Sequence, residues 1–455
     1  MTLFSYPAKA EAVLQELENH GYPFASIRLE NVFMADSSLQ LQMVVDSNQF
    51  ILFDSIVFKG DAKLSTHFLY PYLGLRRGTP YNERQMRAVD ALLAELLYTA
   101  LAQPSGVEFV KDKAYLYIYL NEKKINQFDG YIGLIPNDEK SGKVSVNGEV
   151  TLNLHNIFRI GEALQLHWYS SERYSQHLQL AAHFPYLFRT RFGIQSSFQL
   201  DKQDTSYLTM NYHVGIPYAF HSNDFIEPYF DFSSSTILNP ELIDFSNDSI
   251  AIDYRKSLWG LSTQLRKVDY LLNPRKGLDF SSSVSVGRRT ILPNSRVDAA
   301  LYEGMNLQKN TWRMEGSLRG YVPICKHWVI AARLQAGSLL SGPHYSNELF
   351  HLGGEEGIRG FNTNEILAST YLLYTAELRF LFGKNSFVNL FFDGGNYEKQ
   401  LHNLYLKDNP FGFGAGVHIA VKSGILYLEY ALGRQLGNPI ALKSGKIHLG
   451  VKVSF

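Results

Sequence analysis

The 455-residue sequence has little of what several protein classes require. It has one cysteine, Cys325, so neither a disulfide framework nor a cysteine metal cluster is available. Its 43 basic and 43 acidic residues cancel, which argues against a nucleic-acid partner because such proteins carry a basic excess. The nearest candidate for a membrane-spanning helix, 91–102, contains Glu95 and is shorter than the roughly 20 apolar residues needed. A disulfide-rich, nucleic-acid-binding or helical membrane protein is therefore not expected.

The start of the sequence also lacks a targeting signal. The stretch MTLFSYPAKAEAVLQ has no cationic segment followed by an apolar core, so it is not a secretory signal peptide. Either the protein stays inside the cell, or the sequence begins after a segment that has been removed. The strand pattern described below favours the second interpretation.

Enzymatic motifs are absent as well. The 14 histidines form no HExxH pattern, no GxSxG sequence occurs, and no glycine-rich loop with a lysine lies between a strand and a helix. Glu355 and Glu356 are adjacent, so their side chains point apart and do not form a pair suited to acid–base chemistry. We expect no enzymatic activity, no cofactor and no metal site.

Aromatic residues and glycine are abundant. The sequence has 28 Tyr, 30 Phe and 35 Gly. Large rings favour strands, and turns between strands use glycine, so this composition is typical of a large β-sheet with aromatic girdles. A water-soluble β-rich protein has the same bias, so composition alone makes a membrane barrel only a candidate.

The first 47 residues predict one helix followed by two strands. The strands are expected at about 24–33 and 38–46, and Gly21 and Pro23 follow the helix. The apolar positions of that helix are Ala10, Val13, Leu14 and Leu17.

Residues 48–124 predict the order strand, helix, helix, strand, strand. FILFDSIVFKG is a buried strand that closes at Gly60, and a short helix follows Ser65. Asn82 is a suitable N-cap for a longer helix. The apolar stripe of that helix is Met86, Val89, Leu93 and Leu96, and GVEFV and AYLYIYL are the final strands.

The order of these elements, with HGYPFAS in 1–47 and IVFKG in 48–124, resembles the POTRA (polypeptide-transport-associated) module. A ferredoxin-sized α+β domain of another kind fits the same order. The resemblance implies a complete POTRA-like module at 48–124 and a partial one at 1–47, which lacks the opening strand and helix. Truncation or degeneration of a module explains the missing part.

Residues 125–455 predict an antiparallel transmembrane β-barrel. Segments of about 9–14 residues, such as KVSVNGEVTLNLH and YLLYTAELRFLF, alternate apolar and polar residues between turn clusters. We place eleven strands before the sequence HLGGEEGIRGF and five after it, and sixteen is an even number, as bacterial outer-membrane barrels require. The count depends on how 204–270 and 290–311 are divided. The five later strands are expected near 370–382, 386–394, 410–420, 424–432 and 446–455.

Connections between these segments alternate in length, which indicates short periplasmic turns and longer outer loops. FPYLFRT, LLNPRKG and VPICKH are tight, whereas 237–250 and 339–369 are long. Four histidines fall within alternating segments, where lumen or girdle positions explain them better than metal ligation does: His167, His177, His183 and His213.

The last segment, GKIHLGVKVSF, is an apolar strand that ends on an aromatic residue. One face carries Ile447, Leu449, Val451, Val453 and Phe455. Such an ending resembles the β-signal that outer-membrane proteins present to their assembly machinery.

The glycine-rich stretch HLGGEEGIRGF, 351–361, contains a single arginine, Arg359. The surrounding loop of about 30 residues is long enough to fold back into a barrel. A guanidinium group inside a barrel needs partners, because an unpaired buried charge costs several kcal/mol. Glu377 in YTAELRF and Asp393 in NLFFDGG are downstream acids on expected wall strands. The alternative is an exposed hairpin in which Arg359 pairs with Glu355 or Glu356.

GGEEGIRGF resembles the signature of the BamA/TamA superfamily of outer-membrane assembly and translocation barrels, whose sixth outer loop carries a Val-Arg-Gly-Phe/Tyr tip. This sequence has Ile358 in place of the valine and Gly357 where serine is common. FFDGG, GFGAGVHI, GILYLEYALG and NPRKG resemble further motifs of the same superfamily. The resemblance covers essentially the whole chain, in the right motif order.

The resemblance implies the roles of specific residues. The loop tip docks inside the barrel as a latch, with Arg359 paired to Glu377 and Asp393. The latch motif consists of Gly353, Gly354, Ile358, Arg359, Gly360 and Phe361. The first and last strands meet in a weak seam, about 128–135 against 447–455, which opens sideways. The residues assigned to the seam and β-signal are Phe128, Tyr131, Gly450, Val451, Val453 and Phe455. Gly450 is either a kink that eases opening or a packing accommodation.

The resemblance also implies function and location. An incoming strand pairs with the exposed edge of the open seam by β-augmentation. The expected partners are unfolded outer-membrane or secreted polypeptides, outer-membrane lipid, and accessory lipoproteins or periplasmic factors. The barrel is expected in the outer membrane of a Gram-negative bacterium, with the POTRA-like modules in the periplasm.

Three other functions remain open at this point. A two-partner secretion transporter shares the loop motif, and a plug helix followed by two complete POTRA modules would favour it. A passive or structural barrel would keep the fold and lack client activity. A barrel that presents an enzymatic domain would need additional residues before Met1.

Overall fold

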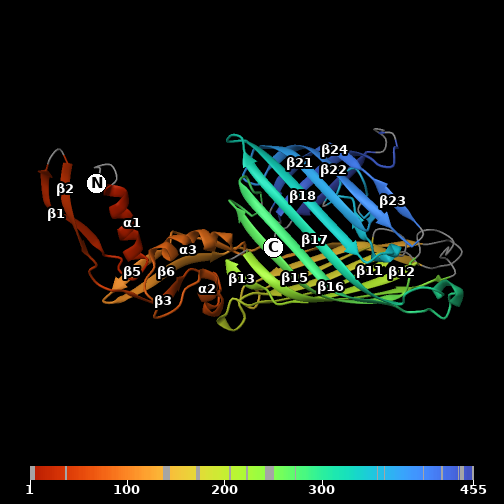
Figure 1. The fold of residues 1–455 in the computed structure, drawn as a ribbon, viewed down its shortest axis with the longest axis horizontal. Helices are drawn as coiled ribbons and strands as arrows, with labels where there is room; N and C mark the ends of the chain where they lie inside the picture. The colour runs from red at the N-terminus through yellow and green to blue at the C-terminus, as the bar shows by residue number, and fades with distance from the viewer. Residues whose placement is uncertain are drawn as a thin grey trace. The chain divides into compact units, whose positions relative to one another are not determined.

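The computed structural model describes most of the chain. The described residues are 6–35, 38–136, 144–170, 175–203, 206–221, 224–240, 251–271, 273–355, 357–362, 364–402, 404–421, 424–438, 440 and 445–452. Two compact units are present (Figure 1): an N-terminal unit of 1–124 with the short segments 158–161 and 186–191, and a barrel unit formed by the remainder. No helix among the described residues is both long and apolar enough to cross a membrane.

The N-terminal unit begins with a helix and a separate two-stranded antiparallel sheet. A four-stranded sheet follows, in which β6 pairs with β3 in parallel and with β4 and β5 in antiparallel orientation. The elements are α1 (Tyr6–Glu18), β1 (Ser26–Ala35), β2 (Ser38–Asp46), β3 (Leu52–Lys59), α2 (Thr66–Leu73), α3 (Glu83–Glu95), β4 (Thr99–Leu101), β5 (Gly106–Val110) and β6 (Lys113–Glu122). The short strand β4 was not predicted, because three residues are too few to show alternation.

Local sequence explains the helices of this unit. The side chain of Asn82 accepts a hydrogen bond from the Gln85 N–H and caps α3. Gly74 ends α2 with a φ of 69°, a conformation that glycine adopts without penalty. Alternate residues of β6 are fully buried and form the core with α2 and α3: Ala114, Leu116, Ile118 and Leu120.

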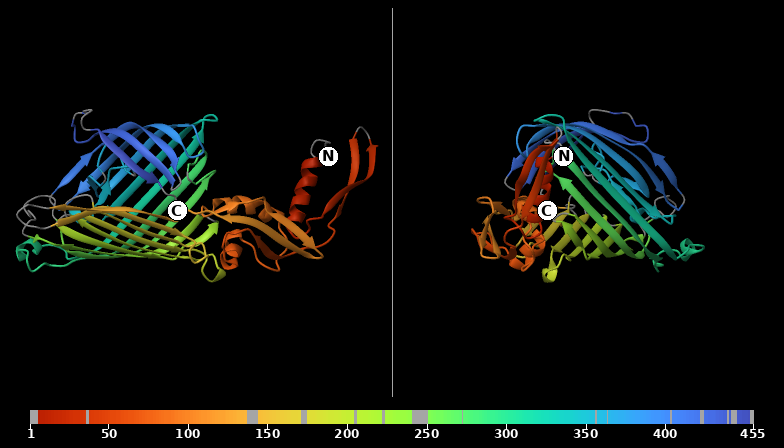
Figure 2. Two further views of the ribbon diagram at one scale, coloured as in Figure 1. Left: turned by 180° about the vertical axis from the view of Figure 1, so that it is seen from behind. Right: turned by 60° about the vertical axis from the view of Figure 1, so that its left-hand side comes forward.

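The barrel unit is one large antiparallel sheet whose strands run obliquely across the barrel (Figure 2). In sheet order, β26 and β7 are neighbours. Its strands are β7 (Gln127–Pro136), β8 (Val144–His155), β9 (Ala163–Ser170), β10 (Gln176–Phe184), β11 (Ile194–Gln203), β12 (Tyr207–Gly215), β13 (Tyr218–His221), β14 (Asp224–Ile237), β15 (Tyr254–Val268), β16 (Gly277–Ile291), β17 (Gln308–Pro323), β18 (Trp328–Leu340), β21 (Thr370–Leu381), β22 (Phe387–Gln400), β23 (Tyr405–Asp408), β24 (Phe411–Val421), β25 (Gly424–Arg434) and β26 (Lys446–Lys452). The prediction of a mostly β protein with a large antiparallel sheet is confirmed.

Strand boundaries differ from the predictions in places. β22 continues to Gln400, six residues beyond the expected end at 394, because polar residues replace the alternation near its end. β23 was not predicted, and it pairs with the same strand, β22, as β24 does. In the same way, β12 and β13 both pair with β14.

The side chains of the barrel strands alternate between two environments. On β15, Trp259 and Leu261 are exposed, whereas Leu258 is buried. Exposed apolar side chains recur on the outward face of most strands, which is the arrangement of a barrel whose outer surface meets an apolar medium.

The segment between β18 and β21 lies inside the barrel unit instead of standing in solvent. It contains a 3-10 turn (Ser346–Glu348) and a small sheet of β19 (Phe350–Leu352) and β20 (Ile366–Ala368). Its side chains and those of the wall form one buried apolar cluster: Leu339, Leu349, Phe350, Leu352, Ile358, Phe361, Ile366, Ala368, Leu373, Tyr397 and Leu401. We call 341–369 the inner loop.

Candidate functional site: a buried arginine at the tip of the inner loop

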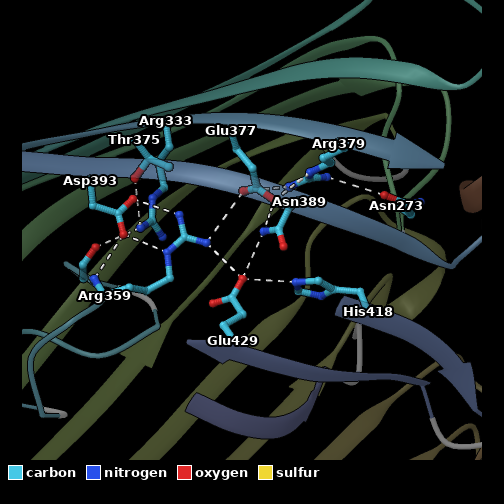
Figure 3. A network of polar contacts seen from close by, with 11 residues as sticks. Asn273, Arg333, Arg359, Thr375, Glu377, Arg379, Asn389, Asp393, His418 and Glu429 are labelled. Carbon is cyan, nitrogen blue, oxygen red and sulfur yellow. Dashed lines mark hydrogen bonds and ion pairs between the residues drawn. The ribbon is translucent and has the colours of Figure 1, made fainter. Parts of the chain in front are cut away.

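The tip of the inner loop brings Arg359 against the wall strands β22 and β25 (Figure 3). Arg359 is only 4% exposed. Two residues beside it, Ile358 and Phe361, are also buried and belong to the apolar cluster. The apolar neighbours therefore hold the tip in place while the guanidinium group faces the polar wall.

Asp393 makes the closest set of contacts with Arg359. Its Oδ2 accepts hydrogen bonds from Arg359 Nε at 2.7 Å and from the Arg359 backbone N–H at 3.0 Å. Its Oδ1 accepts from Nη2 at 2.8 Å. This two-pronged geometry uses the planar fork of the guanidinium, which a lysine does not have.

The remaining face of the guanidinium meets two more acids and an aromatic ring. Arg359 Nη1 donates to Glu429 Oε1 at 3.0 Å and lies 3.9 Å from Glu377 Oε2. The guanidinium carbon also lies 3.4 Å from the ring centre of Phe391, a cation–π geometry. Arg359 is thus surrounded by three carboxylates and one ring.

A second layer of polar residues contacts two of the three acids, Glu377 and Glu429. Asn389 Nδ2 donates to Glu377 at 2.7 Å and to Glu429 at 3.1 Å. Arg379 Nε donates to Glu377 Oε1 at 3.1 Å, and His418 Nε2 lies 3.1 Å from Glu429 Oε1. The network borders a cavity of about 300 Å³. Removing the Arg359 side chain would leave Glu377 with Arg379 and Glu429 with His418, and would take from Asp393 both of its hydrogen bonds with the guanidinium.

Glycines form the slot in which the tip lies. Gly360 has a φ of 94°, and a Cβ there would lie 2.6 Å from the backbone nitrogen of Gly433. A Cβ at Gly412 would overlap the carbonyl oxygen of Arg359. Gly353 (φ 112°) and Gly354 (φ 80°) form the turn that leads to the tip. The backbone of the tip therefore touches the backbones of β24 and β25 directly.

Arg359, Glu377 and Asp393 were predicted from the sequence, and the structure places all three together. The prediction did not include Glu429, His418, Asn389 or Arg379. Glu429 in GILYLEYALG was open to detection, because it is an acidic residue on an otherwise apolar strand. Which of several acids reaches the arginine depends on strand register, and a single sequence does not give that register.

The residues assigned to the seam show mixed placement. Phe128 on β7 is 76% exposed. Tyr131 and Val451 lie within β7 and β26, and their side chains are outside the described set. Val453 and Phe455 lie outside the described residues.

Gly450 lies opposite Tyr427 of β25, and a Cβ there would lie 2.6 Å from the Tyr427 hydroxyl oxygen. The tyrosine side chain lies over the glycine. This favours the packing interpretation of Gly450 over the kink.

The last strand also contacts the loop tip. The Gly360 N–H donates to His448 Nε2 of β26 at 3.3 Å. His448 was not singled out in the sequence, because it is one of the polar residues between the apolar positions of the strand.

Histidines elsewhere in the barrel lie beside acids of adjacent strands. His167 Nε2 is 3.1 Å from Glu149, and His213 Nδ1 is 2.7 Å from Asp231. His177 is likewise hydrogen-bonded to Asp201. Across the described residues, no group of three or more His, Cys, Asp or Glu is arranged to hold a metal ion.

The fold and the docked loop define the class of large antiparallel β-barrels that hold a loop inside the barrel. The sequence matches the model of the Omp85 superfamily domain over residues 146–455. This match covers more than half of the chain, and the protein belongs to the Omp85 superfamily. The predicted superfamily is therefore confirmed, and the chain is an outer-membrane β-barrel of a superfamily that handles polypeptide insertion and translocation in general.

Solved structures with the same fold include members from several bacteria. BamA from Haemophilus ducreyi lacking POTRA domains 1-3 has a TM-score of 0.52 at 15% identity, covering 99% of this chain and 92% of that chain. CdiB from Escherichia coli has a TM-score of 0.58 at 14% identity, with coverage of 98% and 83%. CdiB from Acinetobacter baumannii has a TM-score of 0.56 at 13% identity, with coverage of 96% and 79%. At these identities the likeness shows the shared fold. No curated protein matches the sequence.

Proposed function

We propose that this protein assembles or inserts outer-membrane proteins through a sixteen-stranded barrel that opens sideways between its first and last strands. The observation that carries the proposal is the buried Arg359, which joins the inner loop to Asp393, Glu429 and Glu377. The loop fills part of the lumen and bonds to the wall strands β22 and β25. The arrangement suits a barrel that changes between two states.

The latch would stabilise the closed state. Arg359 contacts β22 and β25, and Gly360 contacts β26, so the loop tip ties the last strand to its neighbours. Breaking a buried ion pair by removing one partner typically costs ~3–5 kcal/mol. A change in these contacts on client arrival is therefore large enough to shift the seam between closed and open.

The seam lies between β7 and β26, which are neighbours in the order of the sheet. The edge of an open β7 or β26 would accept an incoming strand through main-chain hydrogen bonds. The exposed apolar side chains of β26, Ile447 and Leu449, would face lipid beside that strand. Clients of this mechanism are unfolded outer-membrane polypeptides that present strands of their own.

The N-terminal unit would act as the receiving part. We assign 48–124 to a complete POTRA-like module and 1–47 to a partial one, both in the periplasm, where clients and accessory lipoproteins reach them. The strand β5 pairs only with β6 in the described sheet, so its other edge offers a site for an extended client segment.

Depletion of the protein followed by quantitative proteomics of purified outer membranes tests the proposal. Broad loss of β-barrel proteins supports a general assembly function. Loss of one secreted or surface protein would assign dedicated translocation, as in a two-partner secretion transporter. An unchanged outer-membrane proteome would contradict both and leave a structural or passive barrel.

A further inference from the structure

The inner loop has a second set of buried contacts at Asn347, away from its arginine tip. The Asn347 amide nitrogen donates to Ser235 Oγ at 2.8 Å and to the Ile252 carbonyl oxygen at 2.8 Å. Its amide oxygen accepts from the Ile252 N–H at 3.3 Å, and its backbone oxygen accepts from the Tyr254 hydroxyl at 3.1 Å. Asn347 therefore bonds both backbone groups of Ile252, as a neighbouring β-strand would.

The next residue, Glu348, forms a buried ion pair with Arg289 of β16. Arg289 Nη1 lies 2.7 Å from Glu348 Oε2, and both side chains are at most 5% exposed. Glu348 Oε2 also accepts from the Tyr345 N–H at 3.2 Å, and Arg289 Nη1 donates to the Pro343 carbonyl at 3.3 Å. Loss of either charge would leave the other buried without its partner, which is costly.

These contacts lie on a different part of the wall from the arginine latch. Ser235 belongs to β14 and Arg289 to β16. The acids that contact Arg359 belong to β21, β22 and β25, and in sheet order β17 and β18 lie between β16 and β21. The inner loop is therefore held at two separate parts of the wall.

Two cavities border the inner loop. One of about 980 Å³ is bordered by Asn347 and Glu348, and the other, of about 300 Å³, is bordered by Arg359. Both cavities are lined by charged and polar side chains, so water would fill them. The inner loop borders both cavities, so a displacement of the loop would change the open space in the lumen.

We propose that Asn347, Glu348 and Arg289 form a second anchor that holds the inner loop across the lumen independently of Arg359 and closes the lumen to ions and to extended polypeptide. This inference rests on the proposed function and assigns the lumen a gate separate from the seam. The three residues are positioning residues, since they act through the loop. A client that enters at the seam leaves this anchor in place, whereas a client that passes along the lumen has to displace it.

Single-channel recording of the purified full chain in planar lipid bilayers tests the anchor. Arg289→Met removes the charge and keeps an apolar stem of similar length. We expect the fraction of time open to rise about tenfold or more, because charged hydrogen bonds that close the loop are lost. Arg289→Lys keeps a charge for Glu348 and should restore most of the closure. The matched control is Arg288→Met, since Arg288 is the exposed neighbour on the same strand.

Independence from the latch is measured with the double variant Arg289→Met/Arg359→Ala. Independent anchors give fold-changes that multiply. An open fraction for Arg289→Met equal to that of Arg288→Met overturns the proposal, and so does a double variant no more open than Arg359→Ala. If Arg289→Met loses the heat-dependent gel mobility of a folded barrel, Asn347→Ala makes the same test with the ion pair intact.

The same preparations separate this inference from the proposed function. Insertion of an unfolded client barrel into liposomes by the unmodified chain, with no change of gating in Arg289→Met or Asn347→Ala, leaves the function standing and removes the anchor. Opening in those variants without any client insertion by the unmodified chain leaves the anchor standing and removes the proposed function.

Discussion

The two sides of the barrel interior balance their charges in different ways. On the wall of β8 to β14, acids and histidines of adjacent strands bond to each other, as in His213 with Asp231, and that side borders the larger cavity. On the wall of β21 to β25, Arg379 pairs with Glu377 alone, whereas Arg359 of the inner loop contacts all three carboxylates. The acid–histidine pairs of the first wall form between wall strands, without the loop. The second wall depends on the loop for its charge balance, so the loop is part of that wall.

Loss of Arg359 should be the largest single effect. In Arg359→Ala, three buried carboxylates lose their shared partner, and we expect a loss of unfolding free energy of ~3–5 kcal/mol. Urea unfolding of the barrel in lipid vesicles, followed by tryptophan fluorescence, measures the change. Arg359→Lys keeps the charge without the planar fork. Its unfolding free energy should lie between those of the unmodified protein and Arg359→Ala. Unchanged stability and unchanged function in Arg359→Ala would remove the latch from the mechanism.

The second largest loss of stability is expected in the apolar part of the tip. Ile358 is fully buried in the loop cluster, and Ile358→Ala should cost ~2–4 kcal/mol through lost contacts and the cavity that remains. The same urea titration tests it. Ile330→Ala on the exposed face of β18 serves as the control, because it should leave the loop cluster intact. Equal destabilisation by both substitutions would contradict a packed core inside the barrel.

The glycine slot offers a sharper comparison between two glycines of the wall. A Cβ at Gly412 overlaps the carbonyl oxygen of Arg359, whereas the nearest atom to a Cβ at Gly316 is 3.8 Å away. Gly412→Ala should cost ~1–3 kcal/mol, because a backbone atom of the tip has to move. Gly316→Ala should be close to neutral in the same titration. Equal unfolding free energies for Gly412→Ala and Gly316→Ala would contradict a direct backbone contact between the tip and β24.

The smallest effect on stability is expected on the wall of β8 to β14, which borders the larger cavity. Gln199 borders the large cavity, and Gln199→Ala should change the unfolding free energy by at most ~0.5 kcal/mol, as at a surface position. A cost as large as that of Ile358→Ala would show that the cavity wall is packed against something, and the contrast between the two sides would fail.

Sequence reasoning located most strands because one face of each meets an apolar medium, and alternation reports this directly. It failed where alternation stops, as in the polar end of β22 and in the three-residue β4. Arg359 was prominent because a lone arginine among glycines is unusual, and Asp393 because it stands in an aromatic strand. Glu429 lies 70 residues from Arg359. Its role depends on the register of β25 against β24, which is a property of the assembled sheet.

The hydrogen bond from Gly360 to His448 has a consequence for the order of biogenesis. The inner loop leaves the sheet after β18, but its tip bonds to β25 and to the last strand, β26. Arg359 therefore cannot meet Glu429 until the C-terminal strands have been placed in the sheet. A barrel that closed before the loop had entered would bury three carboxylates without their cation. We therefore expect closure of the barrel and entry of the loop to depend on each other.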